Sequence, residues 1–317
     1  MISRRFASVA ALAALTLLAS CGKLQPESTT PAELQFSVLS AQDGASMTGY
    51  WQPLIDDLQK QTGLKVKLFI APNYTVLIQA MAANQTQVAW FSALPAVEAI
   101  QRADATVFAR TILDTGVGTY NSVILVKKGS GLTIDKLMKC DKTLNFGIGD
   151  PQSTTGTLAP LAFLFKPLNV TPQDCFKTVR SAQHQPNMLA VANGLVDAAT
   201  NNSTGLAFYR SGTPEAQAAV AKTEVIWTSP DIPESAMLYR KDLDPAVQAK
   251  LRDFFIGYGK STGPEGDHQR QVMATLKYSR FDAADDSYLG PVIELKKVAD
   301  AVNAPAAPAK TTAPKAP

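Results

Sequence analysis

The segment DPQSTTGT at residues 150–157 directly follows the apolar run LNFGIG at residues 144–149. This order predicts a short strand that ends in glycines, followed by a hydroxyl-rich turn that opens a helix. The first N–H groups of a helix have no partner within it and lie at the positive end of its dipole. They can therefore bind an anion, and Ser153, Thr154 and Thr155 add three hydroxyl donors at the same place. We call residues 150–157 the cradle segment.

An ordinary capped helix is the alternative interpretation of the cradle segment, because Ser and Thr are preferred N-cap residues in any protein. The segment contains no lysine or arginine, so an anion here would be held by dipoles and hydrogen bonds alone. Gly156 would let the backbone come close to such a ligand. Pro160 lies past the first turn and is expected to kink a helix that continues to Leu164.

The first 20 residues are predicted to be a lipoprotein signal peptide that is not part of the fold. Arg4 and Arg5 precede an apolar stretch at residues 7–18, and the sequence LASC at residues 18–21 has the small-residue spacing of a lipoprotein cleavage site. Cleavage would leave Cys21 as the lipidated N-terminus, whereas a plain secretory peptide with an incidental cysteine is the alternative. The apolar stretch is too short for a transmembrane helix, so the mature chain is expected to be exported and membrane-anchored.

Two polar segments flank the expected core. Residues 21–33 contain prolines and are expected to form a tether, and residues 304–317, rich in Ala, Pro, Lys and Thr, are expected to be disordered. Roughly 270 residues lie between them, which indicates two domains or one large one. Charged residues make up 18% of the chain and the formal net charge is +3, with no basic run in the core. This composition gives no support to nucleic acid binding.

Two cysteines remain besides the predicted lipidation site, namely Cys140 and Cys175. An even pair in an oxidising compartment favours a disulfide, which would close a loop around the cradle segment. Two buried free thiols are the alternative. The two histidines, His184 and His268, lie far apart in the sequence and have no cysteine or carboxylate at ligand spacing, so no metal site is expected.

The core alternates expected strands with expected helices. Apolar or alternating runs predict the strands, and residues with a helical apolar period predict the helices between them. This repetition predicts an α/β protein with mainly parallel sheets. The expected strands are residues 34–39, 64–70, 88–91, 106–111, 121–126, 198–200, 225–227 and 237–240, and the expected helices are residues 50–62, 76–83, 95–102, 187–193 and 245–258.

Polar and aromatic residues gather at the ends of the expected strands, where open α/β sheets bind ligands. Each alone is more often structural, since an aromatic is usually a core residue and an Asn run is usually a turn. Together they predict a cleft lined with hydrogen-bond donors and aromatic faces. These residues are Tyr74, Trp90, Phe91, Ser92, Tyr120, His184, Asp197 and the run Thr200, Asn201, Asn202, Ser203 and Thr204.

Several segments of the chain match the motifs of one known family in the same order. They are residues 66–81, 88–90, 146–156, 189–193, 196–202, 225–227 with Ser229 and Pro230, and 253–255. On these segments the sequence resembles the substrate-binding proteins of phosphonate ABC importers over residues 34–260. The resemblance implies a bilobal periplasmic-binding-protein fold (type II-like), with two lobes joined by a two-segment hinge. One lobe would comprise residues 34–120 and 236–303, and the other residues 121–235.

The resemblance also implies a ligand site. In that family the phosphonate oxygens are held at a helix N-terminus by a hydroxyl cluster and a histidine, and two tyrosines face the ligand from the other lobe and the hinge. The matching residues here are Ser153, Thr154, Thr155, His184, Tyr74 and Tyr120, and Asn202 in the strand-end run completes the predicted set.

One departure from the family pattern affects the expected ligand. Members that bind aminoalkylphosphonates place acidic side chains against the ammonium group, and this chain has Thr204 and Ser235 at those positions. Burying an unpaired cation is costly, so a neutral or very small substituent is expected, as in phosphite or methylphosphonate. Glu234 lies next to Ser235, and a shift of the alignment by one residue would restore a carboxylate.

The expected function is that of a solute-binding lipoprotein of an ABC importer. It would capture a phosphonate or a related reduced phosphorus oxyanion between its lobes, with a membrane permease as partner and without a cofactor. A binding protein for another oxyanion such as phosphate, or a receptor for a signalling partner, remains as an alternative. An enzyme is disfavoured, because the sequence has no metal cluster, no Gly-x-Ser-x-Gly elbow and no Cys–His pair with a free nucleophile.

Overall fold

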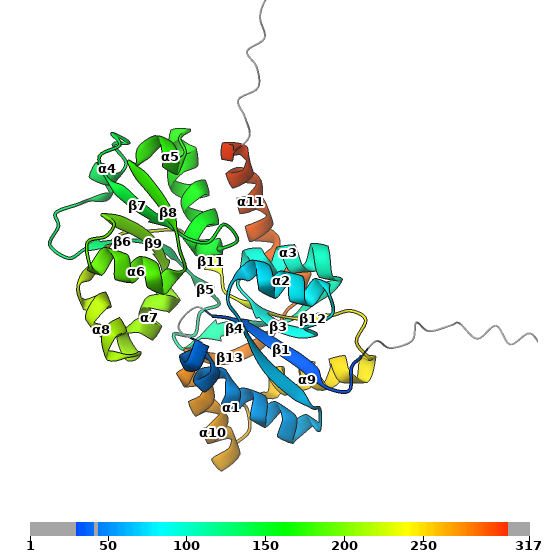
Figure 1. Ribbon diagram of the computed structural model, residues 1–317. Helices are drawn as coiled ribbons and strands as arrows, with labels where there is room; N and C mark the ends of the chain where they lie inside the picture. Colours follow the sequence, from blue (N-terminus) through cyan, green and yellow to red (C-terminus); the bar gives the residue numbers. More distant parts are fainter. Residues whose placement is uncertain (1–29, 41–43, 304–317) are drawn as a thin grey trace, which may run out of the picture.

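A computed structural model describes residues 30–40 and 44–303. These residues form two lobes, each built around its own sheet (Figure 1). The predicted signal peptide, the lipidation site Cys21, most of the predicted tether and the tail at 304–317 lie outside the described residues. Within the described part of the chain, no helix is both long and apolar enough to cross a membrane.

Lobe 1 is organised around a six-stranded sheet with the order β13-β4-β12-β3-β1-β2. In this sheet β1 pairs in parallel with β2 and β3, whereas β12 and β13 run antiparallel to their neighbours. The strands are β1 (Leu34–Leu39), β2 (Val66–Ala71), β3 (Val88–Phe91), β4 (Ala105–Leu113), β12 (Ala236–Arg240) and β13 (Tyr278–Ala283).

Lobe 2 is organised around a five-stranded sheet with the order β10-β6-β9-β7-β8. Here β7 pairs in parallel with β8 and β9, whereas β6 runs antiparallel to β9 and β10. The strands are β6 (Ser122–Lys127), β7 (Asn145–Ile148), β8 (Thr178–Ser181), β9 (Ala198–Asn202) and β10 (Thr223–Thr228).

The expectation of mainly parallel sheets is wrong, because both sheets are mixed. The reversed strands β12 and β6 arise where the chain passes from one lobe to the other, whereas β13, also antiparallel to β4, follows α10 within lobe 1. After its return from lobe 2 the chain forms β12, which lies antiparallel to both β3 and β4, and on entering lobe 2 it forms β6, which lies antiparallel to β9. A strand that comes directly from the hinge starts at the hinge end of its sheet, whereas the parallel strands of βαβ units end there.

The hinge is a short two-stranded ribbon between the lobes. Its strands β5 (Thr119–Tyr120) and β11 (Ile232–Pro233) are antiparallel, with Ile232 opposite Tyr120. The ribbon continues one residue further, since the Glu234 N–H donates to the Gly118 carbonyl at 2.9 Å. Tyr120 and Glu234 are therefore held between the two lobes.

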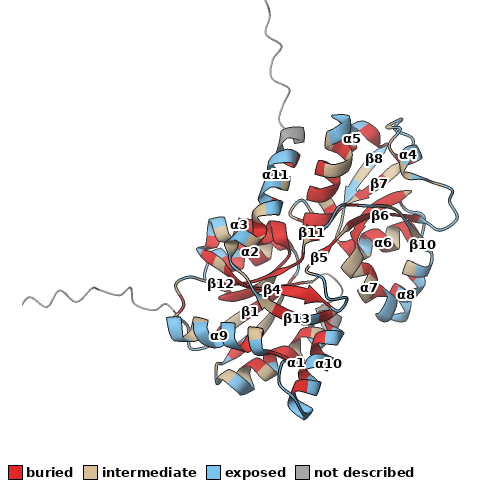
Figure 2. Cartoon of the chain, turned by 180° about the vertical axis from the view of Figure 1, so that it is seen from behind, coloured by how far each residue is buried: buried red, intermediate tan, exposed pale blue. Residues whose placement is uncertain are grey.

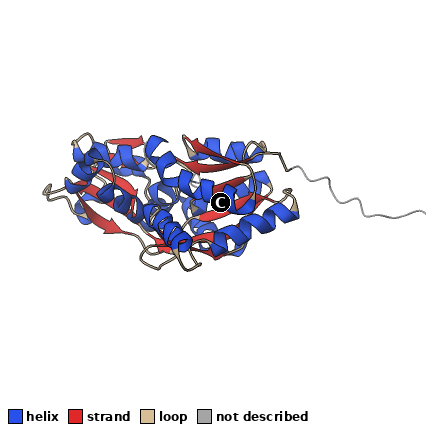
Figure 3. Ribbon diagram, turned by 90° about the horizontal axis from the view of Figure 1, so that it is seen from below, coloured by secondary structure: helices blue, strands red, loops and turns tan. Residues whose placement is uncertain are grey.

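Helices flank the strands of both lobes (Figure 3). The final helix, α11 (Gly290–Asn303), belongs to the segment expected in lobe 1, yet it contacts α3 of that lobe and η2 of lobe 2 (Figure 1). The other helices of lobe 1 are α1 (Gly44–Thr62), α2 (Tyr74–Ala82), α3 (Ala93–Ala103), α9 (Pro245–Gly257), α10 (Pro264–Thr275) and η4 (Asp286–Leu289). Those of lobe 2 are α4 (Ile134–Leu137), η1 (Thr154–Leu158), η2 (Leu161–Phe165), η3 (Lys166–Leu168), α5 (Pro172–Cys175), α6 (His184–Ala192), α7 (Ser203–Ser211) and α8 (Pro214–Ala221).

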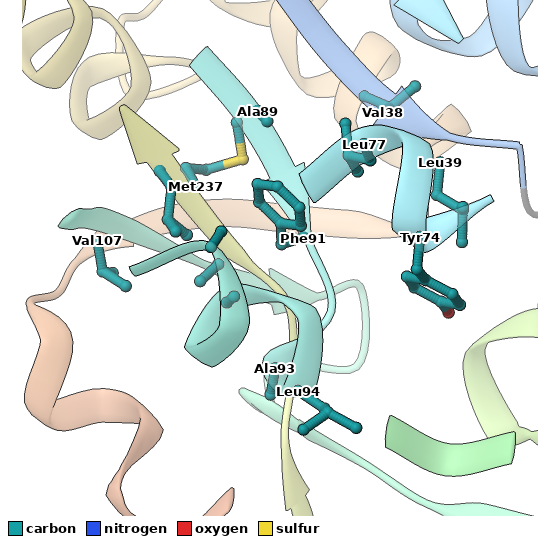
Figure 4. Packing of buried hydrophobic residues seen from close by; sticks show 14 of the residues in the cluster. Val38, Leu39, Tyr74, Leu77, Ala89, Phe91, Ala93, Leu94, Val107 and Met237 are labelled. Atoms are coloured by element: carbon teal, nitrogen blue, oxygen red, sulfur yellow. The ribbon is translucent and has the colours of Figure 1, made fainter. Parts of the chain in front are cut away.

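Packing in the hydrophobic core holds in place the first turns of the helices that face the other lobe. The strands form the buried centre of each lobe, and exposed residues lie on the outer faces of the helices (Figure 2). Val38 of β1, Leu77 of α2 and Leu94 of α3 belong to one hydrophobic cluster, and removing such side chains from water stabilises this packing. Tyr74 is part of the same cluster, but its hydroxyl points away from Leu77 (Figure 4). The core thus holds the start of α2 while leaving that hydroxyl at the cluster's edge.

The cradle segment opens a helix that continues to Leu168 as η1, η2 and η3, beyond the expected end at Leu164. Both η1 and η2 are π-helical, and Pro160 lies between them. Pro160 has no N–H to donate to the Gly156 carbonyl four residues earlier. That carbonyl instead accepts hydrogen bonds from the Gly149 N–H at 2.9 Å and from Thr200 Oγ1 at 2.8 Å. The proline therefore widens the helix without ending it.

Gly156 has to be a glycine for this arrangement. A Cβ added to Gly156 would lie 2.8 Å from Ser153 Oγ and 2.9 Å from the Gly149 Cα, and both contacts are too short. The close approach allows the end of β7 to bond directly to the first turn of η1. Gly156 was expected to let the backbone approach a ligand, whereas in the structure it allows the close contact between strand and helix.

Cys140 and Cys175 form a disulfide in the structure, closing a loop with a sequence separation of 35. Both cysteines lie near the start of β7, because the Lys142 N–H donates to the Cys175 carbonyl at 3.1 Å and Asn145 begins the strand. The cradle segment follows the other end of β7. The disulfide is thus placed to stabilise lobe 2 without contacting the cradle segment.

Replacing both cysteines by serine is expected to lower the free energy of unfolding by roughly 3–4 kcal/mol, the loop-closure entropy that a crosslink of this length removes from the unfolded chain. Urea unfolding of the wild-type and double-serine proteins measures this loss. Because the bond lies at the far end of β7, ligand affinity should change less than about twofold, or 0.4 kcal/mol. A loss of stability below about 1 kcal/mol would contradict the assigned role.

Candidate ligand-binding site

A cavity of about 80 Å³ lies between the lobes. Since one water molecule needs about 10–15 Å³ of such volume, the cavity has room for a small ligand of a few heavy atoms. Its walls come from lobe 1, lobe 2 and the hinge. The lining residues are Leu39, Met47, Tyr50, Trp51, Tyr74, Trp90, Ser92, Tyr120, Thr155, His184, Asn202, Thr204, Gly205, Phe208, Tyr209, Glu234, Ser235, Leu276 and Tyr278.

Most of the predicted ligand residues line this cavity. Ser153 and Thr154 are the exceptions, since both are buried beside the cavity without lining it. The residues that do line it come from α2, the hinge, η1, α6, the start of α7 and the residue before β12. They are Tyr74, Tyr120, Thr155, His184, Asn202, Thr204 and Ser235.

The Ser153 hydroxyl caps the helix of the cradle segment. Its oxygen accepts a hydrogen bond from the Gly156 N–H at 2.9 Å and lies 3.4 Å from His184 Nε2. The capped-helix interpretation is therefore correct for this residue. The cap also connects the cradle segment to His184, so the two predicted parts of the anion site are in contact.

The Thr154 hydroxyl joins the two lobes. The Leu94 N–H, at the start of α3, donates to Thr154 Oγ1 at 2.8 Å, and Thr154 Oγ1 donates to Ser92 Oγ at 3.5 Å. Ser92 is the N-cap residue of α3 but makes no capping bond with its side chain. The N-termini of α3 and η1 therefore face each other, and both helix dipoles point their positive ends toward the cavity region.

A second contact closes the lobes on another side. The rings of Tyr50 in α1 and Phe208 in α7 lie 5.7 Å apart, and both residues line the cavity. Together with the bond between Leu94 and Thr154, this contact means that the structure is a closed arrangement of the lobes.

Two buried phenols supply hydrogen-bond donors. Burial raises the pKa of Tyr74 above its ordinary value of 10, although hydrogen bonds with Ser92 and Ser153 act in the opposite direction. Burial also raises the pKa of Tyr120 well above 10, and the nearby Glu234 carboxyl raises it further. Both hydroxyls therefore keep their protons at neutral pH and can donate to an anion.

His184 is a neutral member of the site. Burial lowers the pKa of His184 from 6.5 to about 4, so the ring carries no charge at neutral pH. Its backbone carbonyl accepts a hydrogen bond from Asn201 Nδ2 at 2.8 Å, which holds the first turn of α6 against β9. A neutral imidazole can still donate one hydrogen bond to an oxyanion.

The alternative that Glu234 supplies a carboxylate, which the sequence left open, agrees with the lining of the cavity. Thr204 and Ser235 line it as predicted, but the Glu234 side chain also lines it and is 2% exposed. Burial raises the pKa of Glu234 from 4.5 to about 8, while hydrogen bonds from Ser235 oppose this shift. The extended hinge strand turns Glu234 toward the lobe interface, which residue-by-residue alignment does not reveal.

Three buried side-chain atoms lack a hydrogen-bond partner among the described residues, and all three belong to this cavity. They are His184 Nδ1, Thr204 Oγ1 and Glu234 Oε2. Leaving a buried polar group unpaired costs about 1–3 kcal/mol each. Their gathering in one closed cavity indicates a polar ligand that would pair with them. The described residues contain no cluster of His, Cys, Asp or Glu that could hold a metal ion.

Comparison with known proteins identifies the family. The family described as "ABC transporter, phosphonate, periplasmic substrate-binding protein" matches residues 36–289. The chain belongs to this family. Phosphonate-binding relatives include the phosphonates-binding periplasmic protein of Escherichia coli (strain K12), which is 36% identical over 290 residues, or 90% of this chain and 83% of that protein.

Two further proteins are similar to this chain. A solved binding protein component of an ABC phosphonate transporter from Pseudomonas aeruginosa has a TM-score of 0.80 and 34% identity, with 86% of this chain and 87% of that chain covered. A phosphate-import protein of Mycolicibacterium smegmatis is 27% identical over 267 residues, or 79% of this chain and 81% of that protein. The bilobal fold predicted from the sequence is thus confirmed.

Membership of the phosphonate-binding family defines the working context of the chain. It is the periplasmic, and therefore extracytoplasmic, substrate-binding protein of an ABC transporter, and its partners are a small ligand and the transporter's permease. The capture of phosphonates for import, which the resemblance predicted, is confirmed at the level of the family.

Several cavity residues of this phosphonate-binding protein were missed as ligand candidates. Ser92 directly follows β3 and carried a usable signal, because polar residues after a buried strand were recognised as a group. The only signal in the sequence for Glu234 was its position next to Ser235. The aromatic residues give no signal in the sequence, since an aromatic in a strand or helix is usually core. They are Tyr50, Trp51, Phe208, Tyr209 and Tyr278, whereas Trp90 was among the strand-end residues predicted for the cleft.

Proposed function

We propose that this protein captures an aminoalkylphosphonate in the closed cavity and delivers it to the permease while anchored by a lipid on Cys21. The observation that carries this proposal is the combination of anion donors with one unpaired carboxyl oxygen, Glu234 Oε2, in the same cavity. Such a pairing suits a small zwitterion. The relative from Escherichia coli, named as binding phosphonates, supports the anionic half of this assignment.

The phosphonate group is proposed to lie between the cradle segment and the hinge. Thr155, Tyr74 and Tyr120 supply hydroxyl donors there, and His184 supplies an imidazole N–H. The facing N-termini of α3 and η1 add positive dipole ends, so the oxyanion is compensated without lysine or arginine. Among the described residues that line the cavity there is no lysine or arginine, and the cradle segment likewise has none.

The ammonium group is proposed to pair with the carboxyl of Glu234, close to the hydroxyls of Thr204 and Ser235. With the ammonium bound, the attraction between the two charges favours ionised Glu234, although burial alone favours the protonated form. Thr204 Oγ1, which has no hydrogen-bond partner among the described residues, offers a further acceptor. The aromatic residues around these groups exclude water from the pair.

Binding is proposed to select the closed arrangement. The ligand touches both lobes and the hinge only when they are closed, so its binding energy favours that state over the open one. The bond from the Leu94 N–H to Thr154 Oγ1 also exists only when the lobes meet. The closed surface is then what the permease recognises.

Isothermal titration of the mature Cys21→Ser protein against four ligands tests the proposal. The ligands are 2-aminoethylphosphonate, methylphosphonate, phosphite and phosphate. The amine is expected to bind at least about tenfold more tightly than methylphosphonate, a difference of about 1.4 kcal/mol. Phosphate should bind more weakly still, because its fourth oxygen would face the aromatic wall without a donor.

Other outcomes would lead to different assignments. The alternative of a neutral ligand has one observation in its favour: with a pKa of about 8, Glu234 is protonated in the unliganded protein at pH 7 and could donate a hydrogen bond. Tightest binding of methylphosphonate or phosphite would favour that alternative. Tightest binding of phosphate would align the protein with its relative from Mycolicibacterium smegmatis.

A further inference from the structure

A tyrosine outside the cavity connects the two hinge crossings. The Tyr288 hydroxyl, on η4, lies 3.1 Å from the Gly118 carbonyl and 3.0 Å from the Glu234 carbonyl, and its one proton is shared between them. Gly118 precedes β5 and Glu234 follows β11, so the two carbonyls belong to the two chain crossings. Tyr288 is not among the cavity's lining residues and cannot touch a ligand there.

The position of Tyr288 is fixed from lobe 1. Asp286, two residues earlier, accepts hydrogen bonds on Oδ1 from the Val107 N–H at 2.8 Å and from Thr106 Oγ1 at 3.1 Å, which attaches η4 to β4. The Arg110 guanidinium lies over the Tyr288 ring, 5.5 Å from its centre. The Tyr288 hydroxyl therefore contacts the hinge from a segment that is attached to the six-stranded sheet.

The peptide groups around Glu234 are held on every side. The Glu234 N–H donates to the Gly118 carbonyl at 2.9 Å, and the carbonyl of Ser235 accepts from the Thr111 N–H at 3.0 Å. The Glu234 carbonyl accepts a hydrogen bond from the Tyr288 hydroxyl. Since a side chain's direction follows from its backbone, these bonds decide that the carboxyl enters the cavity.

We propose that Tyr288 is a positioning residue that sets the ligand selectivity of the cavity by holding the Glu234 backbone, and so its carboxyl, at the hinge. This inference rests on the proposed role of Glu234 as the ammonium partner. It goes further in placing a selectivity determinant outside the cavity, on the opposite side of the hinge ribbon.

Tyr288→Phe is the test variant, because it keeps the ring and its contact with Arg110 and removes only the hydroxyl. We expect the affinity for 2-aminoethylphosphonate to fall at least tenfold, with that for methylphosphonate changing less than threefold. In a Glu234→Gln background, Tyr288→Phe should leave the affinity for the amine within twofold, because the group it positions is gone. An equal loss for both ligands, or the same loss in the Glu234→Gln background, would overturn the proposal.

Tyr258→Phe is the matched control. The Tyr258 hydroxyl donates to Asp57 Oδ2 at 2.6 Å in lobe 1, and Tyr258 does not line the cavity. Its loss removes a tyrosine hydrogen bond of similar kind without touching the hinge. The ratio of the two ligand affinities should therefore stay at the wild-type value in this variant, and a ratio that shifts as in Tyr288→Phe would count against a specific role of the hinge hydroxyl.

A readout without ligand separates this proposal from the assignment of the ligand. The pH dependence of unfolding that Glu234 contributes, defined as wild type minus Glu234→Gln, should fall to less than half in the Tyr288→Phe background, because a released carboxyl reaches water. The groups that face Glu234 are Tyr74, Tyr120, Tyr278 and Tyr288, all with pKa values raised above 10, with Arg110 beyond Tyr288. None of these four tyrosines titrates between pH 6.5 and 8.

The combined outcomes discriminate between the two ideas. Tyr288→Phe could reduce the pH dependence of unfolding that Glu234 contributes, while Glu234→Gln still binds 2-aminoethylphosphonate with the wild-type affinity. In that case Tyr288 does position the carboxyl, but Glu234 is not the partner of the ligand's ammonium group. If the Glu234 contribution to the pH dependence is unchanged by Tyr288→Phe, the positioning role is wrong whatever the ligand.

Discussion

Glu234→Gln is expected to weaken the binding of 2-aminoethylphosphonate by about 30-fold or more, corresponding to about 2 kcal/mol or more. The amide has nearly the same shape as the carboxyl but cannot carry a negative charge, so the ligand's ammonium would be buried beside a neutral group. Methylphosphonate has no ammonium, and its affinity should change less than about threefold, or 0.7 kcal/mol. Isothermal titration of both ligands against both proteins measures the difference.

Glu98→Gln is the matched control for that comparison. Glu98 is also a buried glutamate, 6% exposed, but it pairs with Arg102 on α3 and does not line the cavity. Both affinities should stay near the wild-type values in this variant. An unchanged affinity for the amine in Glu234→Gln would instead remove Glu234 as the ammonium partner and leave Thr204 and Ser235 facing a neutral substituent.

The sequence was sufficient to predict the parts of the fold that depend on local order. The glycine-ended strand and the hydroxyl-rich helix start appear where expected, because apolar periodicity and capping residues act over a few positions. Helix α1 was predicted only from Tyr50, since its apolar period begins there, yet it starts at Gly44. The direction of β12 was not predictable, because pairing across the hinge joins residues far apart in the chain.

The candidate site likewise has residues that could be predicted from local sequence and roles that could not. Tyr74, Tyr120 and Thr155 could be placed by their positions at strand ends and helix starts, and all three line the cavity. The roles of Ser153 and Thr154 could not be separated from that of Thr155 by spacing. Which hydroxyl caps the helix, which reaches Leu94 and which faces the cavity depends on the approach of the other lobe.

Glu234 was named only as an alternative to Ser235, and the reason is geometric. Alignment compares residues by position in the sequence, whereas a strand presents neighbouring side chains to opposite faces. At the end of the hinge ribbon this alternation is broken, and Glu234 and Ser235 both reach the cavity. A ligand prediction based on Ser235 alone therefore lacked the one carboxylate found among the described residues that line the cavity.

The unliganded protein is expected to lose stability as the pH rises above neutrality. The folded state holds Glu234 protonated up to a pKa of about 8, whereas the unfolded chain releases that proton near 4.5. Between these values the unfolded state binds fewer protons, so each pH unit costs about 1.4 kcal/mol, and the accumulated loss at pH 8 is about 4 kcal/mol. Urea unfolding of wild type and Glu234→Gln from pH 4.5 to 8 should show the difference between them growing with pH.

The contribution of His184 to stability has the opposite pH dependence to that of Glu234. It therefore determines the pH range in which a loss of stability can be measured. Its folded pKa of about 4 lies below the ordinary value of 6.5, so its contribution falls as the pH drops from 6.5 to 4. The two contributions largely cancel between about pH 4.5 and 6.5 and leave a net loss of about 1 kcal/mol between pH 6.5 and 8. His184→Gln should remove the cancellation, so that stability declines steadily from pH 4.5. A wild-type protein whose stability is constant from pH 6.5 to 8, with Glu234→Gln showing the same profile, would mean that the Glu234 carboxyl is not held in the dry cavity.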